Sequence, residues 1–161
     1  GSVIPFYLQE AKKGILPITD SSMTRFNISL EEGVDMVIWA LINSIGGEIF
    51  VPKIPSYNIL DLAEAISPKA KKKIVGIRPG EKIHEEMITS TDSIYTIELE
   101  KYYAILTCDG LLKKKYEEAN IRFKDLPVGF CYSSGTNPQF LTIEELRELI
   151  TKNVDKNFFP I

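Results

Sequence analysis

Residues that build metal centres and disulfides are scarce in this sequence. Its 161 residues include one histidine, His84, and two cysteines, Cys108 and Cys131. The cysteines lack Cys-x-x-Cys spacing, and with a single histidine they do not supply the ligands of a structural zinc site. We therefore expect both thiols to be reduced and no metal to be bound.

Long apolar runs and a strong excess of one charge are also missing. No segment approaches the roughly 18 apolar residues of a membrane span, and no basic segment followed by an apolar core opens the chain. The net charge is -3, and the lysine runs at 71–73 and 113–115 are short, which favours solvated surface over a patch that follows phosphates. These absences predict a cytoplasmic protein with no membrane or nucleic-acid partner.

The composition is that of a folded chain. With 44% hydrophobic residues, a chain of this length supplies enough apolar surface for one core, so we expect a single domain over residues 1–161. The chain enters an apolar segment at Val3 without a leader or cap, which indicates a fragment of a longer protein. Gly1-Ser2 has two interpretations, a cloning remnant or a native segment.

Helical and extended patterns alternate along the chain and predict an α/β fold. Residues 3–13 are amphipathic at helical spacing, and Gly14 is placed to end that helix. The extended residues 15–20 follow, and Pro17 keeps this strand at the edge of a sheet or off the ladder.

The clearest helix begins after Ser29, which forms a capping box with Glu32. Its apolar positions repeat at helical spacing, so we expect this helix to bury one face. These positions are Leu30, Val34, Val37, Ile38, Leu41, Ile42 and Ile45. Gly46-Gly47 ends the helix, and residues 48–52 then read as a short buried strand.

The middle of the chain continues the alternation. A second helix over residues 58–66 has Asn58 as its cap. Residues 73–77 form a candidate strand. The polar turn at 78–81 leads into a short helical segment that reaches about Ile88.

The last third predicts three further elements. We expect a strand over residues 102–106 and a charged helix over 111–119. The final helix begins after Thr142, which forms a capping box with Glu145. Its apolar stripe consists of Ile143, Leu146, Leu149 and Ile150.

The segment 76–85 is the first candidate for binding chemistry. It places Arg78, a Pro-Gly turn and Glu81 directly after an apolar strand. Arginine offers a fork of donors suited to phosphate, and a carboxylate accepts hydrogen bonds from ribose hydroxyls. The composition supports a ligand clamp and a surface turn with a salt bridge equally.

Arg25 is the second candidate, because it lies between apolar residues just before a capped helix. The alternatives are an arginine that covers the core with its stem or pairs with Glu31 or Glu32. His84 has no assigned partner, so we expect a structural hydrogen bond rather than catalysis. Lys53, between two prolines, is expected to be exposed or paired.

Taken together, the segments resemble the extended short-chain dehydrogenase/reductase superfamily, and specifically its inverting UDP-N-acetylglucosamine 4,6-dehydratases, which start pseudaminic acid biosynthesis. The resemblance covers nearly the whole chain but only the carboxy-terminal half of such an enzyme. The matching segments are 1–6, 17–20, 23–26, 47–53, 76–85, 132–138 and 140–141.

The resemblance implies a UDP-sugar held between an amino-terminal Rossmann domain and the domain seen here. Gly1, Ser2 and Val3 match the loop and helix start that meet the diphosphate-sugar, where free amides suit an anion. Ile15 matches a position near the uracil. Arg25 and Arg78 match arginines that hold the diphosphate. Glu81 matches a carboxylate that accepts from the ribose.

In such enzymes NADP takes hydride from C4 of the sugar, water is eliminated across C5 and C6, and hydride returns to C6 with inversion at C5. The required glycine-rich loop and Tyr-x-x-x-Lys pair are both missing from this sequence. The resemblance therefore implies a chain with substrate-binding residues, no catalytic or cofactor-binding residues, and no activity alone.

The sequence departs from the usual family pattern at Asn27 and matches it weakly over residues 89–125. Two alternatives are a stand-alone nucleotide-sugar-binding or assembly module and a fragment of a sugar-nucleotide epimerase. The resemblance also implies a homo-oligomer when the enzyme is complete.

Overall fold

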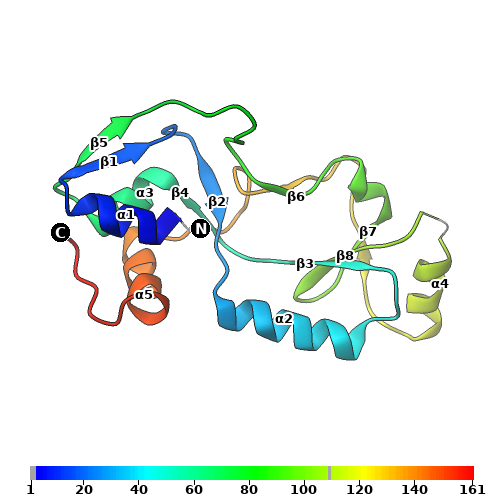
Figure 1. The fold of residues 1–161 in the computed structure, drawn as a ribbon. Helices are drawn as coiled ribbons and strands as arrows, with labels where there is room; N and C mark the ends of the chain where they lie inside the picture. Colours follow the sequence, from blue (N-terminus) through cyan, green and yellow to red (C-terminus); the bar gives the residue numbers. More distant parts are fainter. Residues whose placement is uncertain (1–2, 109) are drawn as a thin grey trace. The chain divides into compact units, whose positions relative to one another are not determined.

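The computed structural model describes residues 3–108 and 110–161, which form a mixed α/β fold, as predicted (Figure 1). The helices in this part of the chain are α1 (Val3–Ala11), α2 (Leu30–Asn43), α3 (Ile59–Ile66), α4 (Leu111–Glu118), α5 (Ile143–Asn153) and the 3-10 helix η1 (Asp92–Tyr95). The strands are β1 (Ile15–Ile18), β2 (Thr24–Phe26), β3 (Ile49–Pro52), β4 (Ser56–Asn58), β5 (Lys71–Ile74), β6 (Glu86–Ile88), β7 (Thr96–Glu98), β8 (Tyr102–Ile105), β9 (Lys124–Asp125) and β10 (Tyr132–Ser133).

The contacts group the chain into two compact units. Unit 1 comprises residues 1–27, 55–85 and 134–161, and unit 2 comprises residues 28–54 and 86–133. Each unit is therefore assembled from segments that lie far apart in the sequence. The single nucleotide-sugar-binding domain expected over residues 1–161 stays a prediction.

Unit 1 has two small sheets and three helices. Strand β1 pairs with β5 in parallel, with Ile15 opposite Lys71, and β2 pairs with β4 antiparallel. Since β1 belongs to a two-stranded sheet, Pro17 lies in an edge strand, as predicted. Helix α3 contacts both α1 and α5.

The core of unit 1 forms where these helices meet β1. Leu16, Ile18, Leu62, Ile66 and Ile150 have no exposed surface. They come from β1, α3 and α5, so the core joins the amino-terminal, middle and carboxy-terminal segments of the chain. Burial of this kind contributes about 25 cal/mol for each Å² of apolar surface removed from water.

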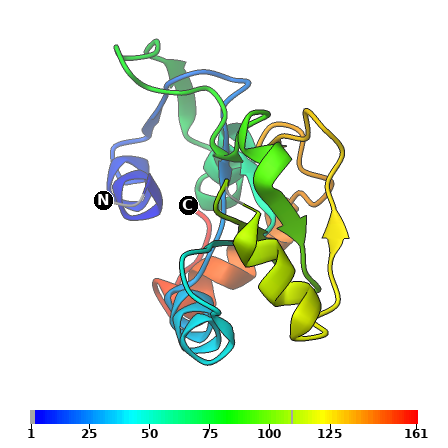
Figure 2. The same cartoon turned by 90° about the vertical axis from the view of Figure 1, so that its right-hand side faces the viewer.

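Unit 2 is built on an antiparallel sheet with the strand order β3-β8-β7-β9. Ile97, Ala104, Leu112 and Tyr116 form its core, and the partly buried Trp39 packs against that core. Trp39 also stacks near Phe50 and Tyr102, with ring centroids 5.0 and 4.4 Å away. Helices α2 and α4 can be followed in Figure 2 by their cyan and yellow-green colours.

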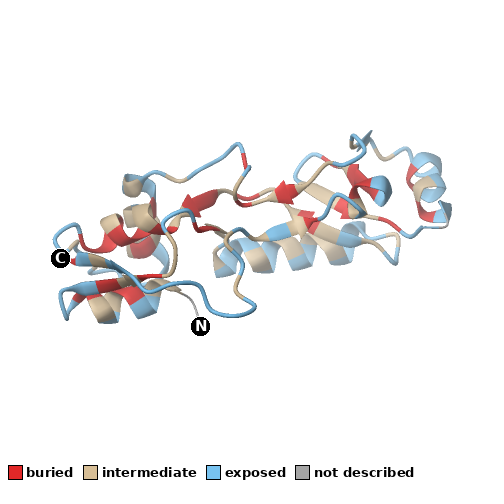
Figure 3. Ribbon diagram, turned by 90° about the horizontal axis from the view of Figure 1, so that it is seen from above, coloured by how far each residue is buried: buried red, intermediate tan, exposed pale blue. Residues whose placement is uncertain are grey.

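Helix α2 has the predicted capping box but lacks the predicted buried face. The Ser29 amide donates to Glu32 Oε2 at 2.7 Å, and the Glu32 amide donates to Ser29 Oγ at 3.2 Å. Yet no residue of α2 is buried (Figure 3). Leu41, for example, is 80% exposed. The prediction was wrong because helical spacing shows that a face is apolar, without showing that this chain supplies the partner.

Local signals placed most other elements correctly. Helix α1 ends at Ala11, just before Gly14, whose positive φ of 76° suits glycine. The Asn58 side chain caps α3 by accepting from the Leu60 amide, and Thr142 and Glu145 form the capping box of α5. Strand β3, strand β8 and helix α4 also lie where the sequence predicts them.

The turn after β5 is where the local prediction failed. The expected helical segment up to Ile88 is wrong, because residues 86–88 form β6 and pair with β10. The partners in that pair, Tyr132 and Ser133, lie more than 40 positions away in the sequence. Strand β5 covers Lys71–Ile74 and therefore shares only residues 73 and 74 with the strand expected over residues 73–77.

The described residues contain no helix that is long and apolar enough to cross a membrane. Within the same residues, no group of three or more histidine, cysteine, aspartate or glutamate side chains is arranged to hold a metal ion. Cys108 and Cys131 are both free thiols.

Candidate functional site

A pocket of about 470 Å³ opens in unit 1. Its walls come from α1, β1, β2, β4, the start of α3 and the segment that follows β5. Four charged side chains, Arg25, Arg78, Glu81 and Glu85, share it with a mostly apolar and aromatic wall. The remaining lining residues are Val3, Phe6, Tyr7, Pro17, Thr19, Met23, Phe26, Tyr57, Ile59 and Val75.

Four of the seven residues expected at the site lie in this pocket. They are Val3, Arg25, Arg78 and Glu81, which three separate chain segments bring together. Ile15 lies on β1, outside the lining of the pocket, and is 46% exposed. Gly1 and Ser2 fall outside the described residues.

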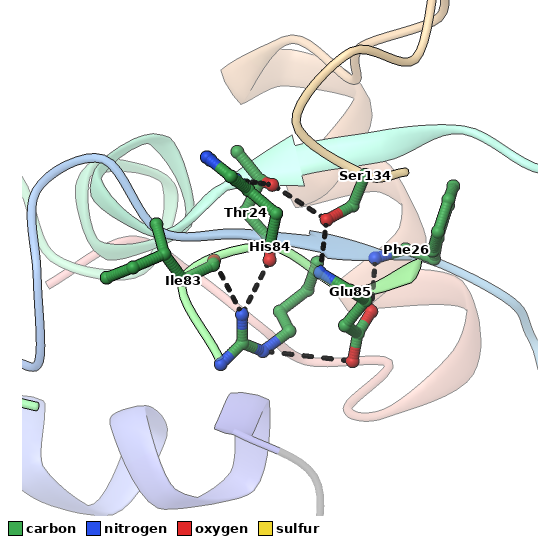
Figure 4. Close-up of polar contacts among 7 residues, drawn as sticks. Thr24, Phe26, Ile83, His84, Glu85 and Ser134 are labelled. Atoms are coloured by element: carbon green, nitrogen blue, oxygen red, sulfur yellow. Dashed lines mark hydrogen bonds and ion pairs between the residues drawn. The ribbon is translucent and has the colours of Figure 1, made fainter. Parts of the chain in front are cut away.

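Arg25 is held in place by backbone carbonyl groups. Its Nη1 donates to the Thr24 carbonyl at 2.6 Å and to the Ile83 carbonyl at 3.0 Å (Figure 4). Its Nε lies 3.8 Å from Glu85 Oε1, and the side chain is 19% exposed. Among the described residues Nη2 has no hydrogen-bond partner, so Arg25 keeps donors for a ligand.

The turn from Arg78 to Glu81 is held by hydrogen bonds to the backbone, and not by the salt bridge that one alternative expected. Glu81 Oε2 accepts from the Arg78 backbone amide at 3.1 Å, and the Glu81 amide donates to the Arg78 carbonyl at 3.0 Å. The exposed Arg78 guanidinium makes no ion pair with any described residue. Gly80, with φ of 82°, supplies the left-handed backbone that this turn needs.

A polar network fastens the end of this loop to β2. Thr24 Oγ1 lies 2.8 Å from His84 Nδ1 and 2.7 Å from Ser134 Oγ. The Glu85 amide donates to Ser134 Oγ at 2.8 Å, and the Phe26 amide donates to Glu85 Oε2 at 2.7 Å (Figure 4). His84 therefore makes a hydrogen bond of the structural kind that we expected.

Thr24, Glu85 and Ser134 were missed as site residues. The segments 23–26, 76–85 and 132–138 all contributed to the family resemblance, but nothing in the spacing told which side chains meet. Thr24 and Ser134 are 110 positions apart in the sequence. A contact at that separation has no local signal.

Two tyrosines of the pocket are neutral at physiological pH. Burial, followed by the charge of Glu81, raises the pKa of Tyr7 to about 12. Burial, followed by the charge of Glu85, raises the pKa of Tyr57 to about 12. Tyr7 donates its hydroxyl proton to the Pro17 carbonyl at 3.0 Å. Neither side chain is a base near neutral pH.

The arrangement suits an anionic ligand that also carries a flat or apolar part. The free donors of Arg25 and Arg78 are shaped for phosphate oxygens. The aromatic side chains around them supply apolar surface. The Glu81 carboxylate adds an acceptor for hydroxyl groups.

A larger hollow of about 1050 Å³ lies in unit 2 and contains none of the expected site residues. Its aromatic wall comes from Trp39, Tyr116 and Phe123. Lys53 also lines this hollow. Its Nζ donates to Glu98 Oε1 at 2.8 Å, so Lys53 is paired, which is one of the two states expected for it. We therefore place the candidate site in the smaller pocket, where unpaired guanidinium donors converge.

Residues 1–107 match the protein family described as "Polysaccharide biosynthesis protein". This match covers more than half of the chain. The chain belongs to this family.

Individual relatives narrow the comparison. The chain is 47% identical to a UDP-N-acetylglucosamine 4,6-dehydratase (inverting) of Campylobacter jejuni over 93% of this chain and 47% of the relative. It is 35% identical to a UDP-glucose 4-epimerase of Rickettsia conorii, over 93% of this chain and 45% of that relative. The chain thus spans about half the length of the curated relatives it matches.

A solved structure also matches nearly the whole of this chain and about half of its own length. The X-ray structure of Pen from Bacillus thuringiensis is similar at a TM-score of 0.77 and 32% identity. The similarity covers 94% of this chain and 46% of that one.

Proposed function

We propose that this chain is the nucleotide-sugar-binding half of an inverting UDP-N-acetylglucosamine 4,6-dehydratase, the first enzyme of pseudaminic acid biosynthesis. The observation that carries the proposal is the meeting of Arg25, Arg78 and Glu81 in one pocket. The similarity to the Campylobacter jejuni dehydratase supports the choice of UDP-N-acetylglucosamine.

The roles proposed for the site residues are those that the family resemblance implies. Arg25, through Nη2, and Arg78 bind the oxygens of the diphosphate as charged donors. Glu81 accepts hydrogen bonds from the ribose hydroxyls. The backbone at Ile15 lies near the uracil.

The first three residues complete the proposed diphosphate-sugar contact. Helix α1 begins at Val3, and the positive end of the helix dipole at this point suits an anion. Gly1, Ser2 and Val3 would meet the ligand there.

The chemistry of the reaction belongs to the other half of the longer protein. NADP supplies hydride transfer in such dehydratases, but this sequence has no glycine-rich loop to bind it and no Tyr-x-x-x-Lys pair. We therefore assign no cofactor contact and no catalytic step to residues 1–161. The proposed role of this chain is to hold the substrate.

Helix α2 supports the proposal of an amino-terminal Rossmann half as partner. Its apolar face is exposed at Leu30, Val34, Val37, Ile38, Leu41 and Ile42. Exposed apolar surface of this extent is typical of a face that another protein segment covers. We propose that the Rossmann half covers it, in a cytoplasmic homo-oligomeric enzyme.

Calorimetric titration with UDP-N-acetylglucosamine tests the binding role. It is done with this chain and with the chain joined to the amino-terminal half of the Campylobacter jejuni relative. Arg78→Ala should weaken binding by about 10- to 100-fold, since a hydrogen bond to a charged group contributes about 1.5–3 kcal/mol. Unchanged affinity in Arg78→Ala would overturn the proposed clamp.

Lys82→Ala is the matched control, because Lys82 is an exposed cation of the same loop that does not line the pocket. It should leave the affinity nearly unchanged. An equal loss in both variants would mean that general positive charge, rather than the Arg78 fork, attracts the ligand.

Turnover separates the alternatives. The joined protein should release a product without the C6 hydroxyl, whereas a product that keeps this hydroxyl would favour the epimerase, which the Rickettsia conorii relative supports. Turnover by the 161-residue chain alone would contradict the proposal that it only holds the substrate. A stand-alone binding module would bind the sugar nucleotide but gain no activity when joined.

A further inference from the structure

The loop that carries Arg78 and Glu81 is fastened at its two ends. At its start, the Val75 amide donates to the Ile18 carbonyl at 2.8 Å. Between residues 76 and 82, the hydrogen bonds within the described chain are those of the Arg78–Glu81 turn itself. The position of both side chains therefore depends on the anchors at residues 75 and 83–85.

The second anchor is centred on two buried hydroxyl groups. Thr24 is 4% exposed and Ser134 has no exposed surface. Ser134 Oγ accepts from the Glu85 amide, and the Ser134 amide donates to the Glu85 carbonyl at 2.8 Å. The Thr24 amide donates to the Ile83 carbonyl at 3.1 Å. Buried hydroxyl groups whose hydrogen bonds are satisfied give a segment one defined position.

The same anchor also holds Arg25. The Ile83 carbonyl that accepts from the Thr24 amide accepts from Arg25 Nη1 as well. A shift of residues 83–85 would therefore move Arg25 and the Arg78 loop relative to each other. The network thus contacts Arg25 directly and also holds the end of the loop that carries Arg78.

Gly135 leaves the space that the His84 ring occupies. A Cβ atom at position 135 would lie 2.7 Å from His84 Cγ and Nδ1. Gly135 is not among the glycines with positive φ, so the reason for glycine is the ring and not the backbone conformation. The glycine lets His84 approach closely and bond Thr24 through Nδ1.

We propose that Thr24, Ser134 and the contact between His84 and Gly135 are positioning elements that set the spacing of Arg25 and Arg78. The inference rests on the proposed function insofar as this spacing sets the affinity for the diphosphate. It gives a role to the 132–138 segment, which the clamp alone leaves unexplained.

Thr24→Val is the first test, because valine keeps the shape of the side chain and removes the hydroxyl. We expect about two- to tenfold weaker UDP binding, the loss that corresponds to one net hydrogen bond. Thr24→Ser restores the hydroxyl and should restore the affinity. Both are measured by calorimetry at a temperature where the variants are fully folded, so that a purely structural loss of stability does not enter.

Amide hydrogen exchange gives a readout without a ligand. In Thr24→Val the amides of residues 24 and 85, whose hydrogen bonds join β2, the loop and Ser134, should exchange faster than in the original chain. In Thr24→Ser they should exchange at the original rate. Unchanged exchange in Thr24→Val would overturn the inference.

A double-mutant cycle tests the contact between the His84 ring and Gly135. Gly135→Ala should displace His84 and weaken UDP binding as much as His84→Ala does. Because both changes remove the same contact, the double variant should be no weaker than either single variant. Additive losses would overturn the role of this contact.

The outcomes separate the two proposals. If the original chain does not bind UDP, the proposed function fails, and the exchange rates still decide the positioning role. If the original chain binds UDP and Thr24→Val binds it equally well, the proposed function stands and the positioning role is wrong.

Discussion

Helices α2 and α3 have the same kind of sequence and opposite surroundings. Both carry a side-chain cap at the amino end and apolar residues at helical spacing. In α3, Ile59, Leu62, Ala63 and Ile66 are at most 3% exposed. No residue of α2 is buried.

The difference lies in the partners that each unit supplies. Helix α3 packs against α1, α5 and β1, whose apolar residues come from both ends of the chain. Trp39 of α2 and Ile45, which follows the helix, pack against the core of unit 2, but the other apolar residues of α2 are not part of that core. Periodicity therefore reports which face needs a partner, and a chain that spans about half of its relatives need not contain that partner.

The largest expected effect separates the two helices directly. Leu62→Ala on α3 should lower the free energy of unfolding by about 2–5 kcal/mol, because it leaves a cavity in a closed core. Leu41→Ala on α2 should change it by no more than about 0.5 kcal/mol, as for other exposed positions. Urea unfolding of both variants measures the contrast. Similar losses would show that the α2 face is packed in solution.

The helices were predictable because their signals are local. Ser29 with Glu32, Asn58, and Thr142 with Glu145 each place a cap within three positions of its partner, and all three caps form. Strand β6 was mistaken for a helix because its pairing with β10 depends on residues far along the chain. Local patterns do not encode such pairings.

The residues of the candidate site also fall into those that local sequence predicts and those that only the fold brings together. Arg25, Arg78 and Glu81 were identified from short segments that resemble a known family. The residues that fasten them, Thr24 and Ser134, meet across 110 positions. Their hydroxyl groups have no recognisable role in the sequence, because their contact forms only in the folded chain.

The exposed face of α2 predicts self-association of this chain when it is alone. Leu41→Glu places a charge in the middle of the face and should reduce association and the binding of apolar dyes. Val128→Glu is the control, because Val128 is an 85% exposed valine of a loop in the same unit. Light scattering after size-exclusion chromatography measures both. A monodisperse original chain with one two-state thermal transition would contradict the prediction.

The smallest expected effect is a loss of stability at alkaline pH, caused by Tyr57 in the pocket of unit 1. The folded-state pKa of Tyr57 is about 12, above its ordinary value of 10.0, because burial and then the charge of Glu85 disfavour the tyrosinate. Its contribution to stability is therefore complete below pH 10.0 and is lost as the pH rises through about 12.

Tyr57→Phe isolates this contribution, because the titration of lysines is common to both proteins. The difference in unfolding free energy between the original chain and Tyr57→Phe should shift in favour of the variant above pH 10.0 and stay constant below it. The difference in tyrosinate absorbance between the original chain and Tyr57→Phe provides an independent titration of Tyr57, because the other tyrosines are common to both proteins. If Tyr57 titrates at its ordinary pKa, the wall of the pocket is open to water. The closed packing around α3 would then not extend to the pocket, which would resemble the exposed face of α2 in its access to water.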